Sequence, residues 1–182
     1  LGKLKSKEYT FLSKITGTVS ESDKLVPDEL KLKVGCRVMT VVNDYADELY
    51  SNGTLATVKA IDKDCITIET DDGYEANILK YTWDIKNYKG SKDKNGKVSV
   101  TSDTIGTFTQ FPLRLGYAIT IHKSQGKTFD KVNLDPYCWD CGQLYVAMSR
   151  VRTIQGLHLT QYIGTRFLVT SADVQLYYSK IS

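Results

Sequence analysis

The chain has 182 residues, of which 41% are hydrophobic and 25% charged, a balance typical of a globular protein with one domain or two small ones. Its formal net charge is only +3, which excludes a strongly basic surface over the whole chain, so any contact with a polyanion would be local. No apolar run approaches the roughly 20 residues that a membrane helix needs, so no membrane partner is predicted.

Residues 34–76 have the pattern of short β-strands. Three runs have strand composition or alternation: residues 37–42, 55–61 and 65–70. Asn52-Gly53 and Asp71-Asp72-Gly73 are tight-turn signals beside these runs. Several short strands with closely spaced turns predict a small antiparallel barrel.

Residues 84–104 are polar and rich in Lys, Gly, Asn and Ser. Such a composition cannot bury much surface, so it predicts an exposed loop or a long hairpin. Its five lysines could contact a nucleic-acid backbone, although a solvated loop is the preferred interpretation.

After Pro112 the apolar period changes to that of helices alternating with short strands. The residues expected to share helix faces are Leu115, Ala118, Ile119 and His122, then Leu144, Ala147, Met148 and Val151, and finally Val174, Tyr177, Tyr178 and Ile181. Residues 131–134 and 157–159 are strand candidates, and Thr170 with Asp173 resembles a capping box. This order predicts an α/β segment after a β-rich insert.

Cysteines offer one weak metal signal. Cys138 and Cys141 have the spacing of half a zinc site or of a redox pair. Structural zinc usually requires a second pair or histidines, and neither is suitably placed, so ordinary reduced thiols are preferred and no metal site is predicted.

Two blocks in the last third of the chain gather polar side chains that suit phosphate contacts. In the first, residues 120–126, Lys123 and Ser124 could contact phosphate and Gly126 permits close backbone approach. His122 closes an apolar stripe there, where a lone histidine is usually a core residue.

In the second block, residues 142–152, Arg150 would lie roughly 110° from the centre of the apolar helix stripe. Its stem could then pack while the guanidinium reaches a phosphate across an interface. A surface arginine that complements a helix C-terminus is the alternative from spacing alone.

One apparent motif is a false match. Gly126-Lys127-Thr128 resembles the end of a phosphate-binding loop, but that loop would need glycine at position 121, which is Ile121. It would also need a strand before it, where the apolar period predicts a helix. The chain therefore has no Walker loop.

Taken together, the blocks resemble those of helicases of the Pif/RecD type, the superfamily 1B group. The matching segments follow in order over about 130 residues: Leu32 to Met39, Asn52 to Thr54, Gln110 to Leu115, Thr120 to Gly126, Gly142 to Arg152, and Gly156-Leu157. Residues 136–141, the lysine-rich stretch 84–104 and the absent Walker motifs depart from the family pattern.

The resemblance implies a fold, an α/β partial RecA-like domain (the second motor domain) with an inserted small SH3-like β-barrel. Residues 1–33, as an N-terminal segment, and residues 111–182 would belong to the RecA-like domain. Residues 34–110 would form the barrel, with 84–104 as its polar loop.

The resemblance also implies roles for individual residues. Arg150 matches the arginine finger and is the expected catalytic residue. Gly126, Thr128, Gln143 and Arg152 would lie on the nucleotide side, whereas Thr120, His122, Lys123 and Ser124 would contact DNA. The barrel would guide single-stranded DNA. Apart from the resemblance, Tyr81, Trp83 or Tyr88 could be stacking surfaces, with packing in the core as an equal alternative.

By this resemblance, the chain is expected to be the C-terminal part of an ATP-dependent DNA helicase, moving 5′ to 3′. The full-length protein would use ATP and Mg²⁺, whereas this fragment, lacking the first RecA-like domain, would bind neither and be inactive alone. A start without Met or a signal peptide favours such a fragment, in the cytoplasm or another DNA-containing compartment and not secreted. The alternatives are a nucleic-acid-binding module without a motor and a helicase segment of a mobile-element relaxase or transposase.

Overall fold

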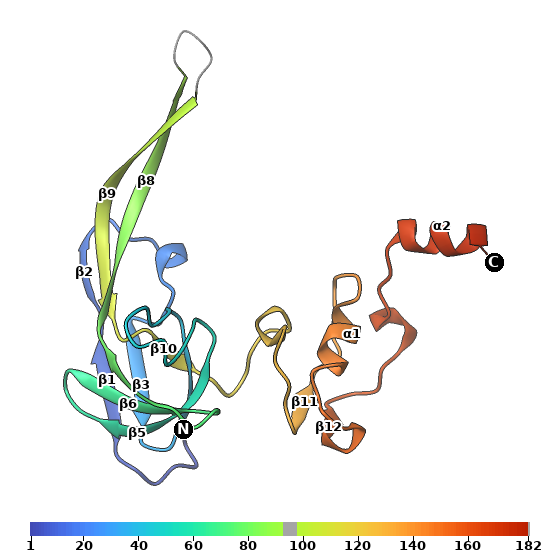
Figure 1. The fold of residues 1–182 in the computed structure, drawn as a ribbon, viewed down its shortest axis with the longest axis horizontal. Helices are drawn as coiled ribbons and strands as arrows, with labels where there is room; N and C mark the ends of the chain where they lie inside the picture. Colours follow the sequence, from blue (N-terminus) through green and yellow to red (C-terminus); the bar gives the residue numbers. More distant parts are fainter. Residues whose placement is uncertain (93–97, 182) are drawn as a thin grey trace. The chain divides into compact units, whose positions relative to one another are not determined.

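The computed structural model describes residues 1–92 and 98–181, and its chain divides into two compact units, Leu1–Ala118 and Ile119–Ser182 (Figure 1). The first unit contains strands with one short 3-10 turn, and the second combines short strands with helices. The protein is therefore of mixed α/β class, with most of its regular structure in sheets.

Strands of the first unit form three antiparallel sheets, with orders β10-β4-β5-β6-β7, β2-β9-β8 and β1-β3. Their bounds are β1 Glu8–Leu12, β2 Lys14–Gly17, β3 Glu29–Lys33, β4 Arg37–Thr40, β5 Leu55–Ile61, β6 Cys65–Thr70, β7 Glu75–Leu79, β8 Tyr81–Lys92, β9 Val98–Gln110 and β10 Leu113–Leu115. A 3-10 turn, η1, covers Glu21–Asp23.

The three predicted strands of residues 34–76 are confirmed as β4, β5 and β6. The two predicted turns hold Gly53 at φ 88° and Gly73 at φ 87°, in the left-handed region that glycine adopts without strain. β10 and β7 are the edges of the five-stranded sheet. Among the residues that the structure describes, the predicted small antiparallel barrel is therefore not observed as a closed barrel.

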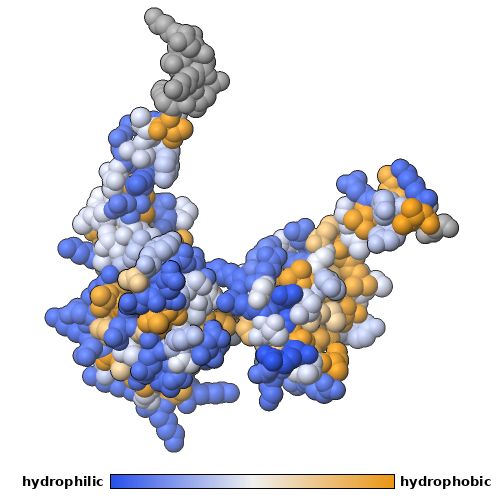
Figure 2. All heavy atoms as spheres, in the orientation of Figure 1, coloured by the Kyte–Doolittle hydropathy of each residue, from blue (hydrophilic) through white to orange (hydrophobic). Residues whose placement is uncertain are grey.

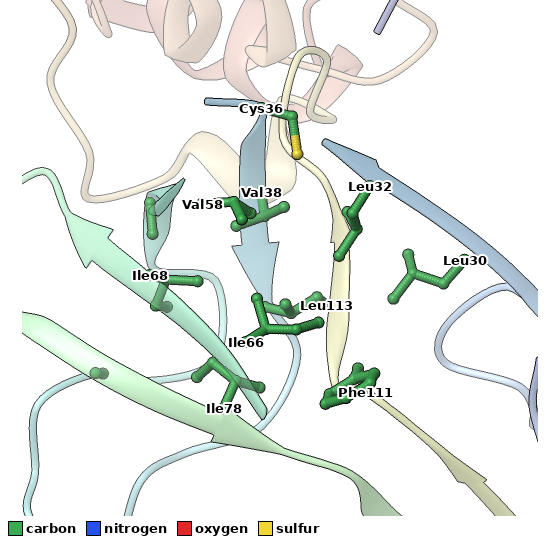
Figure 3. Packing of buried hydrophobic residues seen from close by; sticks show 12 residues of the cluster. Leu30, Leu32, Cys36, Val38, Val58, Ile66, Ile68, Ile78, Phe111 and Leu113 are labelled. Atoms are coloured by element: carbon green, nitrogen blue, oxygen red, sulfur yellow. The ribbon is translucent and has the colours of Figure 1, made fainter. Parts of the chain in front are cut away.

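The larger of the two hydrophobic clusters described in the first unit is its main core, and Figure 3 shows the side chains of this core converging between the strands. Strand alternation explains it, because Ile66 and Ile68 of β6 point inward and are fully buried while the residues between them are half-buried. Leu30 and Leu32 of β3 belong to the same core. Residues 1–33 thus pack with the sheet strands here, and their membership of a RecA-like domain stays a prediction.

Gln110 joins segments of the first unit that are distant in sequence. Its buried amide donates hydrogen bonds to the carbonyls of Phe11 (3.0 Å) and Asp28 (3.1 Å), and its oxygen accepts the N–H of Phe111 (2.9 Å). Because a buried amide without partners is costly, these hydrogen bonds of one side chain stabilise the meeting of three segments.

The predicted polar stretch 84–104 belongs to a long hairpin of β8 and β9 (Figure 1). Its residues 93–97 lie outside the described part of the chain. The strands pair from Tyr81 opposite Gln110 to Lys92 opposite Val98, with one irregularity after Ile85. Of the two alternatives offered by the composition, the long hairpin is confirmed.

The second unit contains a parallel pair of strands, two helices and three 3-10 turns: β11 Val132–Leu134, β12 Leu157–Leu159, α1 Gln143–Met148, α2 Ala172–Ile181, η2 His122–Ser124, η3 Ile154–Gly156 and η4 Thr165–Phe167. Its core is small and consists of Leu134, Cys138, Leu144, Ala147 and Phe167. The strand, helix, strand, helix order predicted after residue 131 is confirmed.

The helix predicted from Leu115 to His122 is wrong. Leu115 ends β10, which pairs with β4, and only the short η2 turn follows. Gly116 continues this contact, since its N–H donates to the carbonyl of Arg37 (2.9 Å) and an added Cβ would lie 2.8 Å from the carbonyl oxygen of Val38. Strand pairing therefore overrides the helical period.

Helix α2 begins one residue later than the predicted capping box places it. Ser171, and not Thr170, accepts the N–H of Asp173 (3.3 Å). The predicted apolar face, which includes Val174 and Ile181, is exposed, and α2 buries no residue. Within the described residues, no helix combines the length and apolar character needed to cross a membrane.

Candidate functional site

The first predicted block folds into a tight turn around η2. The N–H of Ser124 donates to the carbonyls of Thr120 and Ile121 (both 3.1 Å), and the N–H of Lys123 donates to the Thr120 hydroxyl (3.4 Å). Thr120, His122 and Lys123 are exposed. The core position considered for His122 is therefore wrong, and its imidazole lies at the surface.

Ser124 differs from its neighbours because it is buried. Its hydroxyl donates to the carbonyl of Ile121 at 2.6 Å, so it stabilises the turn from within. The structure thus presents three of the four predicted DNA-binding side chains outward, while the fourth supports them. The DNA-binding role of all four stays a prediction.

Gly126 and Thr128 follow this turn. Gly126 has φ 74°, and no atom would lie within 4 Å of an added Cβ, so its backbone is open to close approach. Thr128 is exposed. Both predicted nucleotide-side residues are therefore accessible.

Arg150 lies beyond the helix on which it was predicted. Helix α1 ends at Met148 and Ser149 is its C-cap, so the angle calculated from helical spacing does not apply to Arg150. The N–H of Arg150 donates instead to the carbonyl of Ala147 (3.2 Å) in a closing turn. Its side chain starts from the helix end, which is the part of the prediction that the structure retains.

The guanidinium of Arg150 is held by three contacts within the unit. Nε donates to the carbonyl of Val146 (2.9 Å), one terminal nitrogen to the carbonyl of Lys127 (3.4 Å) and the other to the hydroxyl of Ser149 (2.9 Å). The side chain is half-buried. These partners are two carbonyls and one hydroxyl, so the positive charge has no carboxylate partner among them.

A short backbone ladder joins the two predicted blocks. The N–H of Phe129 donates to the carbonyl of Arg150 (2.8 Å), and the N–H of Arg152 donates to the carbonyl of Phe129 (2.9 Å). Phe129 and Val151 form a parallel bridge, and Arg152 pairs with Asp130 (Nε–Oδ1 3.2 Å). The segment that follows the first block therefore lies directly beside the end of the second.

Gln143, a weaker nucleotide-binding candidate, is 6% exposed. Its side-chain oxygen accepts the backbone N–H of Trp139 (3.1 Å), which ties the loop before α1 to the first turn of the helix. The side-chain oxygen of Gln143 is therefore already hydrogen-bonded within the protein.

The cysteines do not gather into a site. Cys138 is buried in the small core, and burial, followed by the nearby negative charge of Asp135, raises the pKa of its thiol. Cys141 is exposed, and both are free thiols. Nowhere in residues 1–92 or 98–181 do three or more His, Cys, Asp or Glu side chains group as metal ligands.

Sequence reasoning missed the residues that connect the blocks. Lys127, Phe129 and Asp130 each contact the 150–152 segment, two of them through backbone atoms. The pairing of Phe129 with the 150–152 segment joins residues about twenty positions apart, and so short a pairing gives no periodic pattern in the sequence. Of the suggested stacking aromatics, Trp83 packs on Phe108 (ring centroids 5.6 Å apart), whereas Tyr88 is exposed.

Comparison with known proteins identifies the family. No protein-family model matches the chain. It is 36% identical over 156 residues to the ATP-dependent DNA helicase Pif1 of Bdellovibrio bacteriovorus, covering 85% of this chain and 32% of that protein. It is also 36% identical over 128 residues to the helicase of the same name from Campylobacter jejuni, covering 68% of this chain and 27% of that protein.

Solved structures agree with the sequence comparison. The chain superposes on a crystal structure of Bacteroides Pif1 bound to single-stranded DNA with a TM-score of 0.82 and 36% identity, covering 98% of this chain and 41% of that one. The chain belongs to the Pif1-type helicases of superfamily 1B. A Bacteroides Pif1 complex with ADP-AlF3 and single-stranded DNA gives a TM-score of 0.80, and Candida albicans Pif1 gives 0.74 at 26% identity.

The chain spans about a third of the length of the bacterial Pif1 relatives and about two fifths of the solved Pif1 chains. Because 98% of it aligns with Bacteroides Pif1, the Pif1-type match includes both the all-β unit and the α/β unit.

Proposed function

We propose that this chain is the part of an ATP-dependent DNA helicase that supplies the arginine finger, Arg150, and single-stranded-DNA contacts to an ATPase cleft. The backbone ladder between Phe129 and the 150–152 segment is the observation that supports this best. It joins the two blocks whose chemistry suits nucleotide and DNA, and a motor must couple those two ligands.

Arg150 has the chemistry that a finger needs. Its planar donors match phosphoryl oxygens, and it stays charged at any physiological pH. Its present partners are neutral oxygens, so the phosphoryl oxygens of a nucleotide would bind the guanidinium more strongly. Gln143 and Arg152 are proposed as supporting residues on the same segment, with Gly126 and Thr128 facing the nucleotide.

Single-stranded DNA is the proposed ligand of the η2 turn. The outward groups of Thr120, His122 and Lys123 can donate hydrogen bonds to phosphate oxygens, while the buried Ser124 fixes the turn that presents them. Two of the solved relatives are described as bound to single-stranded DNA. The family resemblance favours translocation from 5′ to 3′.

The remainder of the ATPase site would come from the first RecA-like domain of the full-length protein, including the ligands of ATP and Mg²⁺. The nucleotide supplies the phosphoryl group whose developing charge Arg150 would neutralise. We assign the α/β unit to the second RecA-like domain and the five-stranded sheet to an SH3-like insertion. The fragment alone would then be inactive as an ATPase.

The test is DNA-stimulated ATP hydrolysis by the full-length protein carrying Arg150→Ala. An arginine finger is worth about 10³–10⁵ in turnover, so we expect a loss of at least about a thousandfold with single-stranded-DNA binding retained. Arg166→Ala is the matched control, because Arg166 is an exposed arginine of the same unit that lies over the ring of Phe167. Unchanged turnover in Arg150→Ala would remove the finger assignment.

A further inference from the structure

The charge of this chain is unevenly distributed. Residues 86–105 contain five lysines and two aspartates, so they carry the whole formal charge of +3, and acidic and basic residues balance in the rest of the sequence. This stretch belongs to the β8–β9 hairpin, and its excess of lysine provides a local attraction for a polyanion.

The charged part of the hairpin is a free two-stranded ribbon. Strand β2 pairs with β9 only from Thr109 to Gly106, and the N–H of Thr18 adds one contact to the carbonyl of Ile105 (2.9 Å). From Ile105 towards the turn of the hairpin, residues 86–92 of β8 and 98–104 of β9 pair only with each other. At about 3.4 Å per residue, residues 86–92 extend roughly 24 Å past this point.

Both faces of the ribbon are open to solvent. All of residues 86–90 and 100–104 are exposed, and Figure 2 shows this arm as largely hydrophilic. Strand alternation places Lys86 and Tyr88 on one face, opposite Thr104 and Ser102. No described contact engages the side chain of Lys86 or of Tyr88. The nearest carboxylate on this face, Asp84, lies on the other side of the irregularity, where β8 belongs to the three-stranded sheet.

The opposite face is electrostatically different. There, Lys89 pairs with Asp103 (Nζ–Oδ2 3.0 Å), so its charge is already partly compensated. The face with Lys86 and Tyr88 therefore presents uncompensated positive charge beside hydroxyl groups that can donate to phosphate oxygens.

Duplex DNA fits this surface better than a single strand does. Proteins usually hold single strands by stacking successive bases on several aromatic side chains, and Tyr88 is the one aromatic residue on the described ribbon beyond Ile105. The major groove of B-DNA, about 12 Å wide, admits a two-stranded β-ribbon, and its phosphates attract lysine without regard to sequence.

We propose that the free ribbon of the β8–β9 hairpin is a second nucleic-acid site, which binds the phosphate backbone of duplex DNA through the face with Lys86 and Tyr88. The proposal rests on the proposed function only in taking DNA as the substrate. It assigns the hairpin to the duplex, whereas the η2 turn is assigned to the single strand.

The test compares two DNA probes on the full-length protein without nucleotide. Fluorescence anisotropy would measure its affinity for a forked duplex and for an oligothymidine matched to the tail, over a series of salt concentrations. In Lys86→Gln we expect roughly threefold to tenfold weaker fork binding, with the slope of log K against log salt reduced by about one. Affinity for oligothymidine should not change.

Two further variants sharpen the test. Lys59→Gln is the matched control, since Lys59 is an exposed strand lysine of β5 that pairs with Glu69 (2.8 Å), and it should leave both affinities unchanged. Lys89→Gln should weaken fork binding less than Lys86→Gln, because Asp103 already compensates Lys89.

Three results would overturn the proposal. One is unchanged fork affinity in Lys86→Gln, and another is an equal loss on oligothymidine, which would mean a single-strand contact. The third is a lower melting temperature than Lys59→Gln without DNA, which would mean that the ribbon binds the protein itself. None of these results depends on ATP turnover, so they are separable from the outcome for Arg150.

Discussion

The two units of this chain differ in how much of their apolar surface is buried from solvent. The first has a core of twelve residues, none more than 4% exposed, ten of which lie in six strands. The core of the second has five residues, and large side chains such as Trp139, Tyr145 and Tyr162 are 70% or more exposed around it. The blocks assigned to nucleotide and DNA both lie in the second unit.

This difference indicates that the two units contribute differently to stability and to ligand binding. Local unfolding costs least where few apolar contacts are buried, and segments that rearrange with ligands come from such regions. Short elements such as α1 and η2 present side chains at their ends, whereas the strands of the five-stranded sheet fix many of theirs in a core. We therefore expect stability to reside mainly in the first unit and ligand response in the second.

The largest expected loss of stability comes from replacing a core phenylalanine by alanine, and the loss should differ between the two units. Phe111 is fully buried and meets the ring of Phe11 edge-on at 4.8 Å, so Phe111→Ala should lower the free energy of unfolding of the first unit by about 3–5 kcal/mol. Phe167→Ala should cost its own unit only about 2 kcal/mol, because the small core around it can relax.

Native-state hydrogen exchange, read separately in each unit, measures this difference. Equal losses for the two variants would contradict the view that the first unit is the stable one.

A glycine of the second unit provides an intermediate effect. An added Cβ at Gly156 would lie 1.9 Å from the carbonyl oxygen of Asp130, which leaves no room for alanine. Gly156→Ala should therefore destabilise the second unit by about 1–3 kcal/mol. At Gly164 nothing lies within 4 Å, so Gly164→Ala is the control and should have little effect in urea unfolding.

Because Asp130 is next to Phe129, Gly156→Ala should also weaken the ladder to Arg150, and faster exchange of the Arg152 amide would report it. Protection of that amide at the wild-type level would show that the ladder is independent of this packing.

The smallest effect is a dependence of stability on pH. The Lys24 ammonium, with Nζ 2.6 Å from the carboxylate, lowers the pKa of Asp28; burial opposes this shift and the Ser13 hydroxyl adds to it. The unfolded chain then binds the proton at higher pH than the folded chain does. The stabilisation is complete above the unfolded pKa of about 3.9 and is lost as the pH falls through the lower folded value.

Asp28→Asn should make the free energy of unfolding of the first unit less dependent on pH between pH 6 and pH 3. Asp72→Asn, in an exposed turn, is the control variant. An unaltered pH dependence in Asp28→Asn would mean that this carboxylate does not contribute.

Much of the first unit could be predicted because its signals are local. Alternation in β6 and glycine in two tight turns identify strands without reference to the rest of the chain. The segment after Leu115 could not be predicted, since its helical period loses to pairing with β4, a partner over seventy residues away. The buried amide of Gln110 gave no signal either, because two of its three partners, Phe11 and Asp28, come from distant segments.

The candidate site was predicted from residue types, and its geometry did not follow from the sequence. Arg150 and Lys123 stand out in the sequence as candidate phosphate-binding side chains at the ends of predicted elements. Their arrangement depends on where α1 ends and on pairing between Phe129 and Val151, and neither follows from local propensity. Gln143 and Ser124 were predicted as ligand contacts, yet both use their side chains inside the unit.

The ladder at Phe129 has a consequence for genetics. Its hydrogen bonds join main-chain atoms, so exchanging side chains at Phe129 or Val151 for alanine leaves the N–H and C=O groups in place. Alanine substitutions at these positions would therefore measure only the loss of side-chain packing. They would not detect the main-chain hydrogen bonds that link the two blocks. Proline, or an ester in place of the amide at position 129, removes the donor itself and would test directly how strongly the two blocks are coupled.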